Sequence, residues 1–391
     1  MLFTAFILTA NGQKGPFDSM WESNDSIPFV WDGGIYLPAT IDNKYPARIL
    51  FTTNANRQLV VDTTYLKEKC WQPPKIEKGL ILRETDTLRL KASNTKHEVK
   101  FGNIAANFPY MLISDIRNVL GKHADGIMWD TFFEYSPFEV NFQQKFLRTL
   151  TAIPDSVKRN YRCLPLTVTD SKFMIEAYVW FNNKRIGGLY QLWLGGNDDI
   201  LFTSYIVKRH NLMAYKGKTR QLLAQYTNIG DTTTTTTTFA LADSVHLWLD
   251  NIGRASVSMP MPEETSHSRM HNVGYIGAGI LSNYNLVFDP AHNKLYYCPY
   301  KAYTPEKRTW GFSWVNRTDI GKGWIVRSIY KGSAAEKAGI KLGDTIIKVN
   351  GKKVENFPWD EERALSHRSS ITLLLKTGKG VRKVTIEEEE F

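Results

Sequence analysis

Four aspartates are the side chains of this chain best suited to paired acid–base chemistry. Asp125 and Asp130 lie in its first half, and Asp198 and Asp199 lie side by side in its second half. Two carboxyl groups that share one proton can hydrolyse an amide, because one acts as the base for an attacking water while the other protonates the carbonyl. The surrounding pattern places all four aspartates on loops beside apolar segments, where their carboxyl groups would not face one another. A catalytic pair built from them is therefore the less favoured alternative.

Metal chemistry has weaker support. His267 and His271 are four residues apart, as metal ligands on helices often are, but their Ser and Asn neighbours indicate a loop and no third ligand is evident. The three cysteines, Cys70, Cys163 and Cys298, have no paired spacing, which argues against a zinc site and against a disulfide framework. We therefore expect no metal and no cofactor.

The acidic residues flank two segments that repeat each other. Residues 34–62 and residues 174–202 each contain an alternating strand, a polar Asn-Lys turn, a second apolar strand and a Gly- or Asn-rich loop that leads into another apolar run. A second pair of segments follows at 124–133 and 273–281. The chain therefore contains two copies of one β-rich lobe.

This layout resembles the aspartic peptidases of the pepsin and retropepsin kind. In that family each lobe offers a strand ending in Asp-Thr/Ser-Gly and a later apolar-apolar-Gly segment that supports it. The sequences Phe51-Thr52-Thr53-Asn54-Ala55 and Leu192-Trp193-Leu194-Gly195-Gly196 stand at the two triplets, so Thr52 and Trp193 occupy the aspartate positions. Tyr275-Ile276-Gly277 keeps the supporting segment in the second lobe, whereas the first has Ile127-Met128-Trp129.

The two substitutions bear directly on activity. A threonine hydroxyl is not a base at neutral pH, and an indole has neither an acceptor nor a titratable proton in range. The resemblance therefore implies two lobes, at 28–150 and 172–300, without catalytic residues at Thr52 and Trp193.

Composition limits the remaining classes. The chain has 391 residues, 42% of them hydrophobic, which is enough for two or three domains with large cores. Its formal charge is +10, but Lys and Arg are dispersed and form no arginine-rich tract, so a generally basic surface is favoured over nucleic-acid binding. No run reaches the ~18 to 20 apolar residues of a transmembrane helix, and we expect no integral membrane span.

Two segments allow alternative interpretations. Residues 1–13 resemble the end of a secretory signal whose basic leader is missing, and a disordered or strand-forming N-terminus is an equal alternative. The signal interpretation predicts a secreted, periplasmic or cell-envelope protein. Thr232 to Thr238 are β-prone and fit an exposed strand or hairpin next to the cleft, with a low-complexity loop as the alternative.

The last eighty residues have a different pattern. We expect strands at 323–330, 344–351, 371–375 and 381–387, a short helix at 333–339 and a second helix at 359–367. This order, with the phrase Gly-Ser-Ala-Ala-Glu-Lys-Ala-Gly-Ile-Lys-Leu-Gly-Asp-Thr-Ile-Ile-Lys-Val-Asn-Gly, resembles a PDZ domain of the type found on bacterial periplasmic proteases. We place this domain at 308–391.

The PDZ resemblance implies a groove that binds the C-terminus of a peptide or polypeptide, which adds a strand to a sheet edge. The predicted peptide-binding residues are Trp310, Gly311, Phe312, Ser313, Trp314 and Leu365. The Gly311 and Phe312 amides would bind the terminal carboxylate, and Phe312, Trp314 and Leu365 would line a pocket for the last side chain. The alternative is that these aromatic residues fill the core of the domain.

The expected fold is thus mainly β, with two pepsin/retropepsin-like β lobes in tandem and a C-terminal α+β PDZ domain. The function that follows is a non-catalytic, peptidase-like protein that binds peptides through its interlobe cleft and its PDZ groove. The alternative is an active aspartic endopeptidase in which the PDZ domain assists substrate recognition. The two differ in whether a pair of carboxyl groups faces the cleft.

Overall fold

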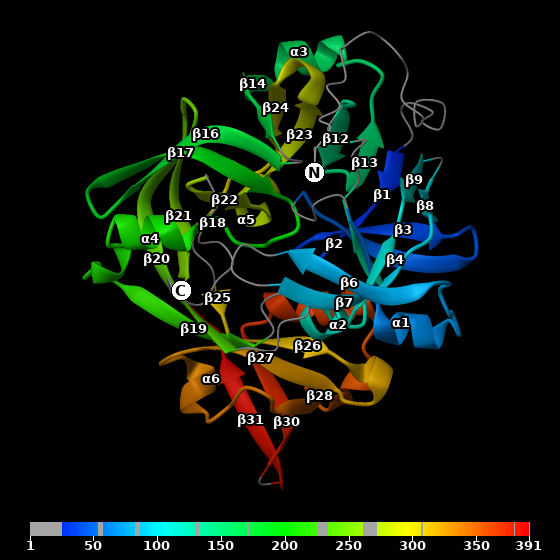
Figure 1. The fold of residues 1–391 in the computed structure, drawn as a ribbon. Coiled ribbons are helices and arrows are strands. Elements are labelled where there is room, and N and C mark those ends of the chain that lie inside the picture. Colours follow the sequence, from blue (N-terminus) through cyan, green and yellow to red (C-terminus); the bar gives the residue numbers. More distant parts are fainter. Residues whose placement is uncertain are drawn as a thin grey trace.

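The computed structural model describes residues 26–391 except 54–57, 83–86, 103, 130–132, 134, 170–171, 226–233, 261–271, 306–307, 379 and 391. The predicted signal segment, Asp130, His267 and His271 lie outside the described residues. The protein is mainly β, as predicted, and its helices are short elements between the strands (Figure 1). Among the described residues, no helix has the length and apolar character needed to cross a lipid bilayer.

The first lobe is built on one sheet with the strand order β6-β7-β10-β5-β11-β4-β3-β8-β9, to which β2 is added beside β3. Its strands are β2 (Val30–Trp31), β3 (Ile35–Ile41), β4 (Tyr45–Phe51), β5 (Leu59–Asp62), β6 (Ile76–Leu82), β7 (Thr87–Ser93), β8 (His97–Phe101), β9 (Ile104–Phe108), β10 (Met111–Ser114) and β11 (Gly126–Met128). Its helices are α1 (Thr63–Glu68) and α2 (Arg117–Leu120).

The second lobe occupies the first part of a longer sheet, in the order β15-β16-β17-β22-β18-β21-β20-β19. Its strands are β15 (Thr167–Thr169), β16 (Lys172–Phe181), β17 (Lys184–Trp193), β18 (Ile200–Phe202), β19 (Thr219–Gln225), β20 (Thr234–Leu247), β21 (Asp250–Pro260) and β22 (Gly274–Gly277). Its helices are α4 (Ser204–Arg209), η2 (Leu212–Ala214) and α5 (Ala278–Leu281). The threonine run lies in β20 from Thr234 onward and pairs with β19 on one side and β21 on the other.

The two lobes pair their strands in the same order and with the same directions. In the first, β3-β4-β11-β5-β10-β7 are joined by antiparallel, parallel, antiparallel, parallel and antiparallel pairings. In the second, β16-β17-β22-β18-β21-β20 follow the same series. Each copy opens with a tight hairpin turn in the left-handed backbone region, at Asp42-Asn43 and at Asn182-Asn183. Asn and Asp tolerate this conformation, which explains the polar turns of the repeat.

A separate six-stranded sheet connects the lobes, and Figure 1 shows it at the top of the molecule. It has the order β1-β13-β12-β23-β24-β14, with the two halves meeting at the antiparallel pair β12–β23. Its strands are β1 (Ser26–Pro28), β12 (Phe138–Asn141), β13 (Phe146–Thr149), β14 (Arg162–Pro165), β23 (Tyr284–Asp289) and β24 (Lys294–Pro299), with α3 (Asp155–Asn160) and η4 (Pro290–His292) beside them. Phe138 and Phe288 stack across the central pair with ring centroids 4.5 Å apart. One hydrophobic core therefore extends through both lobes.

The C-terminal domain has its own hydrophobic core and the predicted order of elements. Its strands are β25 (Arg308–Thr309), β26 (Phe312–Asn316), β27 (Trp324–Tyr330), β28 (Thr345–Val349), β29 (Lys352–Lys353), β30 (Ser370–Thr377), β31 (Gly380–Glu387) and β32 (Glu389–Glu390). Its helices are η5 (Thr318–Ile320), α6 (Ala334–Lys337), η6 (Val354–Asn356), α7 (Trp359–Ala364) and η7 (Leu365–His367).

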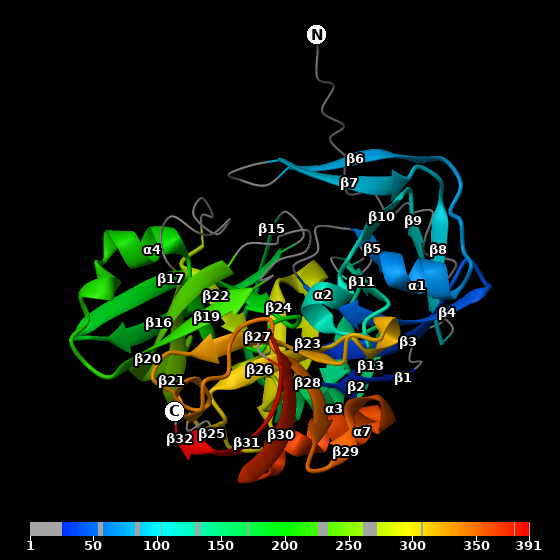
Figure 2. The same cartoon turned by 90° about the horizontal axis from the view of Figure 1, so that it is seen from below.

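This domain is joined to both lobes rather than standing apart from them. Strand β19 of the second lobe pairs with β27, so the sheet of the second lobe continues into the C-terminal domain. On the other side, α2 of the first lobe packs against β26. Figure 1 shows the domain at the bottom of the molecule, below β19 and α2, and Figure 2 shows it from below. Although its core is distinct, its position relative to the lobes is fixed by backbone pairing.

Candidate functional site

The predicted degenerate positions lie where the two lobes meet. Thr52 follows β4, and its amide donates to Met128 O at 3.2 Å. The next residue, Thr53, is fully buried; its hydroxyl donates to Leu192 O at 2.6 Å and accepts from Leu194 N at 3.2 Å. The strand end of one lobe is thus hydrogen-bonded to the strand end of the other.

Glycine is required at this junction because the backbones approach closely. A Cβ on Gly195 would lie 2.5 Å from Thr52 Cβ and 2.2 Å from Thr52 Oγ1. A Cβ on Gly196 would lie 2.5 Å from Cε3 of the Trp193 ring, and this indole is only partly buried. Thr52 and Gly195 are therefore in contact across the lobes, and Trp193 fills space beside them.

Three of the four aspartates considered as acid–base candidates lie in the described residues, and each has a different partner. Asp125 is buried and forms ion pairs with Arg117 at 2.7 Å and with Arg48 at 3.3 Å. Asp198 accepts a hydrogen bond from Ser258 Oγ at 2.7 Å. Asp199 accepts from Tyr303 OH at 2.7 Å and from Ser256 N at 3.2 Å. Each carboxylate is thus explained by a structural role.

No cluster of three or more His, Cys, Asp or Glu side chains that could hold a metal ion occurs within the described parts of the chain. Cys70 and Cys163 are exposed and Cys298 is partly buried, and all three are free thiols.

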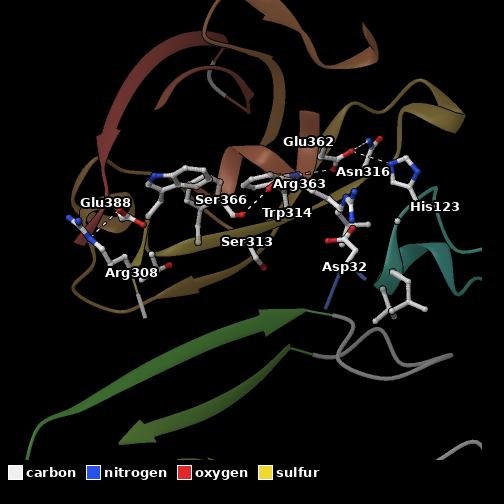
Figure 3. Close-up of a pocket in the computed structure, with 17 residues that line it drawn as sticks. Asp32, His123, Arg308, Ser313, Trp314, Asn316, Glu362, Arg363, Ser366 and Glu388 are labelled. Carbon is white, nitrogen blue, oxygen red and sulfur yellow. Dashed lines mark hydrogen bonds and ion pairs between the residues drawn. The ribbon is translucent and has the colours of Figure 1, made fainter. Parts of the chain in front are cut away.

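A groove in the C-terminal domain is the second candidate site. A cavity of about 350 Å³ lies between β26 and the α7–η7 helix, and the first lobe forms its remaining wall. Its lining residues are Asp32, Val119, Leu120, Gly121, His123, Arg308, Thr309, Trp310, Phe312, Ser313, Trp314, Val315, Asn316, Glu362, Arg363, Ser366 and Glu388. Figure 3 shows Arg308 and Glu388 at one end, with Asn316, Glu362 and His123 at the other.

The start of β26 presents free backbone groups to this cavity. Phe312 lies opposite Ile329, and the adjacent cross-strand bond runs from Tyr330 N to Gly311 O at 2.8 Å. In an antiparallel ladder this places Phe312 in a non-hydrogen-bonded pair, so its own N–H and C=O point away from β27. Among the described strands β26 pairs with β27 alone, which leaves these groups on an open sheet edge.

The far end of β26 follows the same alternation. Asn316 lies opposite Trp324, and Arg317 N donates to Gly323 O at 2.8 Å, so the Asn316 C=O also points away from β27. Here, however, Lys122 N of the first lobe donates to Asn316 O at 2.8 Å. The edge is therefore open at Phe312 and Trp314 and closed at Asn316.

The predicted binding residues differ in how they contribute to this groove. Trp310, Phe312, Ser313 and Trp314 all line the cavity, although Trp310 and Phe312 are largely buried. Leu365 lies in the hydrophobic core of the domain with 2% of its surface exposed and does not line the cavity. Leu365 thus fills the core of the domain, which was the alternative to a role in the groove, whereas the aromatic residues of β26 contribute to both the core and the groove.

Gly311 is held by its neighbours rather than left open. Its φ is +83°, and a Cβ would lie 2.3 Å from Ser333 Cβ, so only glycine fits here. Its amide donates to Thr309 Oγ1 at 3.0 Å, and its carbonyl accepts from Tyr330 N at 2.8 Å. The Gly311 amide is thus already engaged, which leaves the Phe312 N–H as the outward amide of the predicted pair.

Charged groups mark the two ends of the groove. Near the start of β26, Arg308 Nε forms an ion pair with Glu388 Oε2 at 3.1 Å. At the other end, Glu362 accepts from Asn316 Nδ2 at 2.6 Å and from Trp314 Nε1 at 3.2 Å, and His123 Nε2 lies 3.2 Å from the same carboxylate. Glu362 therefore links the helix, the strand and the first lobe.

The first-lobe residues of this site could not be found from the sequence pattern. His123 stacks on Trp359 with ring centroids 4.5 Å apart, and Trp359 Nε1 donates to Asp32 Oδ2 at 2.7 Å. Asp32 and His123 lie far from β26 in the sequence and carry no motif that relates them to it. In the sequence, Asp32 and His123 are simply polar residues beside apolar segments, a pattern that many loops share.

Comparison with known protein families agrees with this geometry in one part of the chain. Residues 301–376 match the family model of the PDZ domain. No curated protein matches the sequence. The C-terminal domain is therefore a PDZ domain, and the groove between β26 and α7 belongs to it.

Proposed function

We propose that the protein is a non-catalytic polypeptide-binding protein that uses its PDZ groove to hold the extended end of a polypeptide. PDZ domains bind peptide C-termini by strand addition. The observation that carries the proposal is the open edge of β26, where Phe312 and Trp314 present backbone groups to a cavity of about 350 Å³ opposite α7. The lobes then act as a scaffold that fixes the groove and forms one of its walls.

We further propose that the two lobes are pepsin-like and lack the catalytic pair. The common series of strand pairings and the contact between Thr52 and Gly195 support this interpretation, because the resemblance predicts two equivalent loop tips that meet. With threonine and tryptophan at the aspartate positions, the junction offers no base for water and no acid for a carbonyl.

In the proposed complex the last residue of the ligand lies near Trp310 and Phe312, whose rings provide apolar surface. Its carboxylate lies near the Phe312 N–H and near Arg308, whose guanidinium pairs with Glu388 through Nε and has further N–H groups to donate. A charge-assisted hydrogen bond of this kind favours a free carboxylate over an amide. A hydrophobic last residue and affinity near micromolar, about −8 kcal/mol, are expected.

The full-length protein can be titrated with fluorescent peptides that end in Leu, Val or Phe, each with a free or an amidated C-terminus. Free ends should bind more tightly, and Arg308→Gln should reduce that difference. Arg368→Gln is the matched control, because Arg368 is exposed on the same domain and does not line the cavity. Equal binding of free and amidated ends would rule out carboxylate capture, and absence of binding with every peptide would refute the groove as a ligand site.

A separate assay addresses catalysis. Purified protein should not cleave a peptide library between about pH 3 and 7, the range in which a shared-proton carboxylate pair works. Pepstatin-sensitive cleavage that follows the protein through purification would instead support the alternative of an active aspartic endopeptidase.

A further inference from the structure

We propose that the first lobe closes one end of the PDZ groove, so that the groove holds only about four terminal residues of a polypeptide. This inference rests on the proposed function, since it concerns the length of the ligand that the same groove accepts. It makes the first lobe a determinant of which polypeptides bind.

The direction of the ligand follows from the two ends of the groove. A carboxylate near Arg308 and Phe312 places the last ligand residue at the start of β26, so the ligand strand runs antiparallel to β26 and its upstream residues extend toward Asn316. Backbone bonds to Phe312 and Trp314 use ligand residues two positions apart. The next bonding position along the edge is Asn316, and its carbonyl is already occupied by Lys122 N at 2.8 Å.

The closing segment is backbone, not a side chain that can rotate away. Gly121 has a φ of +81°, and a Cβ there would lie 3.4 Å from both N and O of Asn316, so the chain already lies against the strand. His123 is held by its stack on Trp359 and by its contact with Glu362. These contacts fix the segment 119–123 from both sides of the groove.

The helix that carries this segment is also anchored. Arg117, at the start of α2, is 2% exposed and binds Asp125 at 2.7 Å in the first lobe and Asp319 at 3.2 Å in the PDZ domain. Displacing Lys122 from Asn316 would strain a buried ion-pair cluster that spans both parts. A ligand chain must therefore leave the groove after its fourth residue or so, and an internal segment that needs to continue along β26 is excluded.

The test uses full-length protein and labelled peptides of four, six and eight residues with one common hydrophobic C-terminal tetrapeptide and Gly-Ser upstream residues. For the wild type we expect affinities that agree within about twofold across the lengths. Lys122→Pro replaces the N–H that closes the edge by a ring carbon, which cannot fit against an Asn316 oxygen only 2.8 Å from this nitrogen, so the segment must move off the strand. The six-residue peptide should then gain about fivefold over the four-residue peptide, the effect of one added hydrogen bond. Lys122→Ala is the matched control, because it keeps the amide and should behave like the wild type.

Hydrogen exchange at the Lys122 amide of the wild type provides a readout that does not depend on the variants. Protection of this amide should persist when the eight-residue peptide is saturating. Loss of that protection, or wild-type affinity that rises with each added residue, would overturn the length limit while leaving the proposed function intact. Failure of every peptide to bind wild type and variants alike would refute the proposed function and this inference together.

Discussion

Arg117 lies among four carboxylates at the contact between the first lobe and the PDZ domain, and the most distant of them is Asp62 at 3.7 Å. Its guanidinium binds Glu68 at 2.7 Å, Asp125 at 2.7 Å and Asp319 at 3.2 Å while only 2% of the side chain is exposed. Burial opposes the charge, yet the hydrogen bonds with Glu68 and Asp125 hold the pKa of Arg117 above its usual range. The change Arg117→Met keeps an apolar stem in this position and removes the charge.

The expected cost is about 3–5 kcal/mol at pH 7, because the buried carboxylates lose the cation that they share, and only Arg48 beside Asp125 and Arg317 beside Asp319 remain. Asp62, Asp125 and Asp319 have side chains that are 0%, 6% and 4% exposed and carry most of this cost, whereas Glu68 is 40% exposed and can turn to water. Glu68→Gln is accordingly the control, with an expected loss below about 1 kcal/mol.

The pH dependence has a defined sign. Burial raises the folded-state pKa of Asp62, which lies beside Arg117, above its ordinary value of 3.8. A raised folded-state pKa means that the folded protein binds the proton more tightly, so the stability from this group is present at low pH and is lost as the pH rises through that pKa. Without Arg117 the pKa of Asp62 should rise further. The deficit of the variant should therefore be largest near pH 7 and shrink toward pH 4.

Urea unfolding followed by tryptophan fluorescence measures the effect, since Trp359 of the PDZ domain lies against Arg48, which pairs with Asp125 of this cluster. With a slope of about 3 kcal/mol/M, the midpoint should fall by roughly 1–1.7 M at neutral pH. A loss below about 1 kcal/mol, or one that does not change between pH 7 and pH 4, would show that water screens the cluster. The assignment of Arg117 as a buried anchor would then be wrong.

Two further changes probe the lobe junction and the PDZ fold. Gly195→Ala should lower the free energy of unfolding by about 1–3 kcal/mol, because the new Cβ would lie 2.5 Å from Thr52 Cβ. In thermal unfolding, adding Thr52→Gly to this variant should restore most of the lost stability. If the second change restores nothing, the two loops do not touch. Ser333→Ala should lower the free energy of unfolding by about 1 kcal/mol, since the Ser333 hydroxyl is the N-cap of α6 and accepts from Glu336 N at 3.1 Å. Ser333→Thr keeps a capping hydroxyl and should lose much less stability in the same measurement.

Local sequence signals predicted the elements well because those signals act over short distances. The polar turns at Asp42-Asn43 and Asn182-Asn183 fix two equivalent hairpins, and Asn350-Gly351 fixes another in the PDZ domain, all in the left-handed backbone region. The predicted helix at 333–339 is present as α6, capped by Ser333 and followed by Gly339 with a φ of +77°. Residue types with strong backbone preferences were sufficient for these features.

The site depends on contacts that sequence patterns do not encode. The Gly311 amide was predicted to bind an anion, but it donates to the Thr309 hydroxyl, and the rotamer of that side chain is not determined by local sequence. Leu365 was predicted to line the pocket, but the helix turns it into the core. The closure of the groove by Lys122 arises from docking of the first lobe on the PDZ domain, which many weak contacts decide together.

The pairing of β19 with β27 makes the PDZ domain a fixed attachment point for mechanical load. A polypeptide held at β26 and pulled from its upstream end loads β26 against β27, and from there the tension passes into β19 and the second lobe through backbone hydrogen bonds. Tension would thus reach the core of both lobes without stretching a linker. The expected response to such a pull is release of the ligand and not extension of the protein. The ligand is held by only a few edge hydrogen bonds, which break before the strand pairings within the protein do.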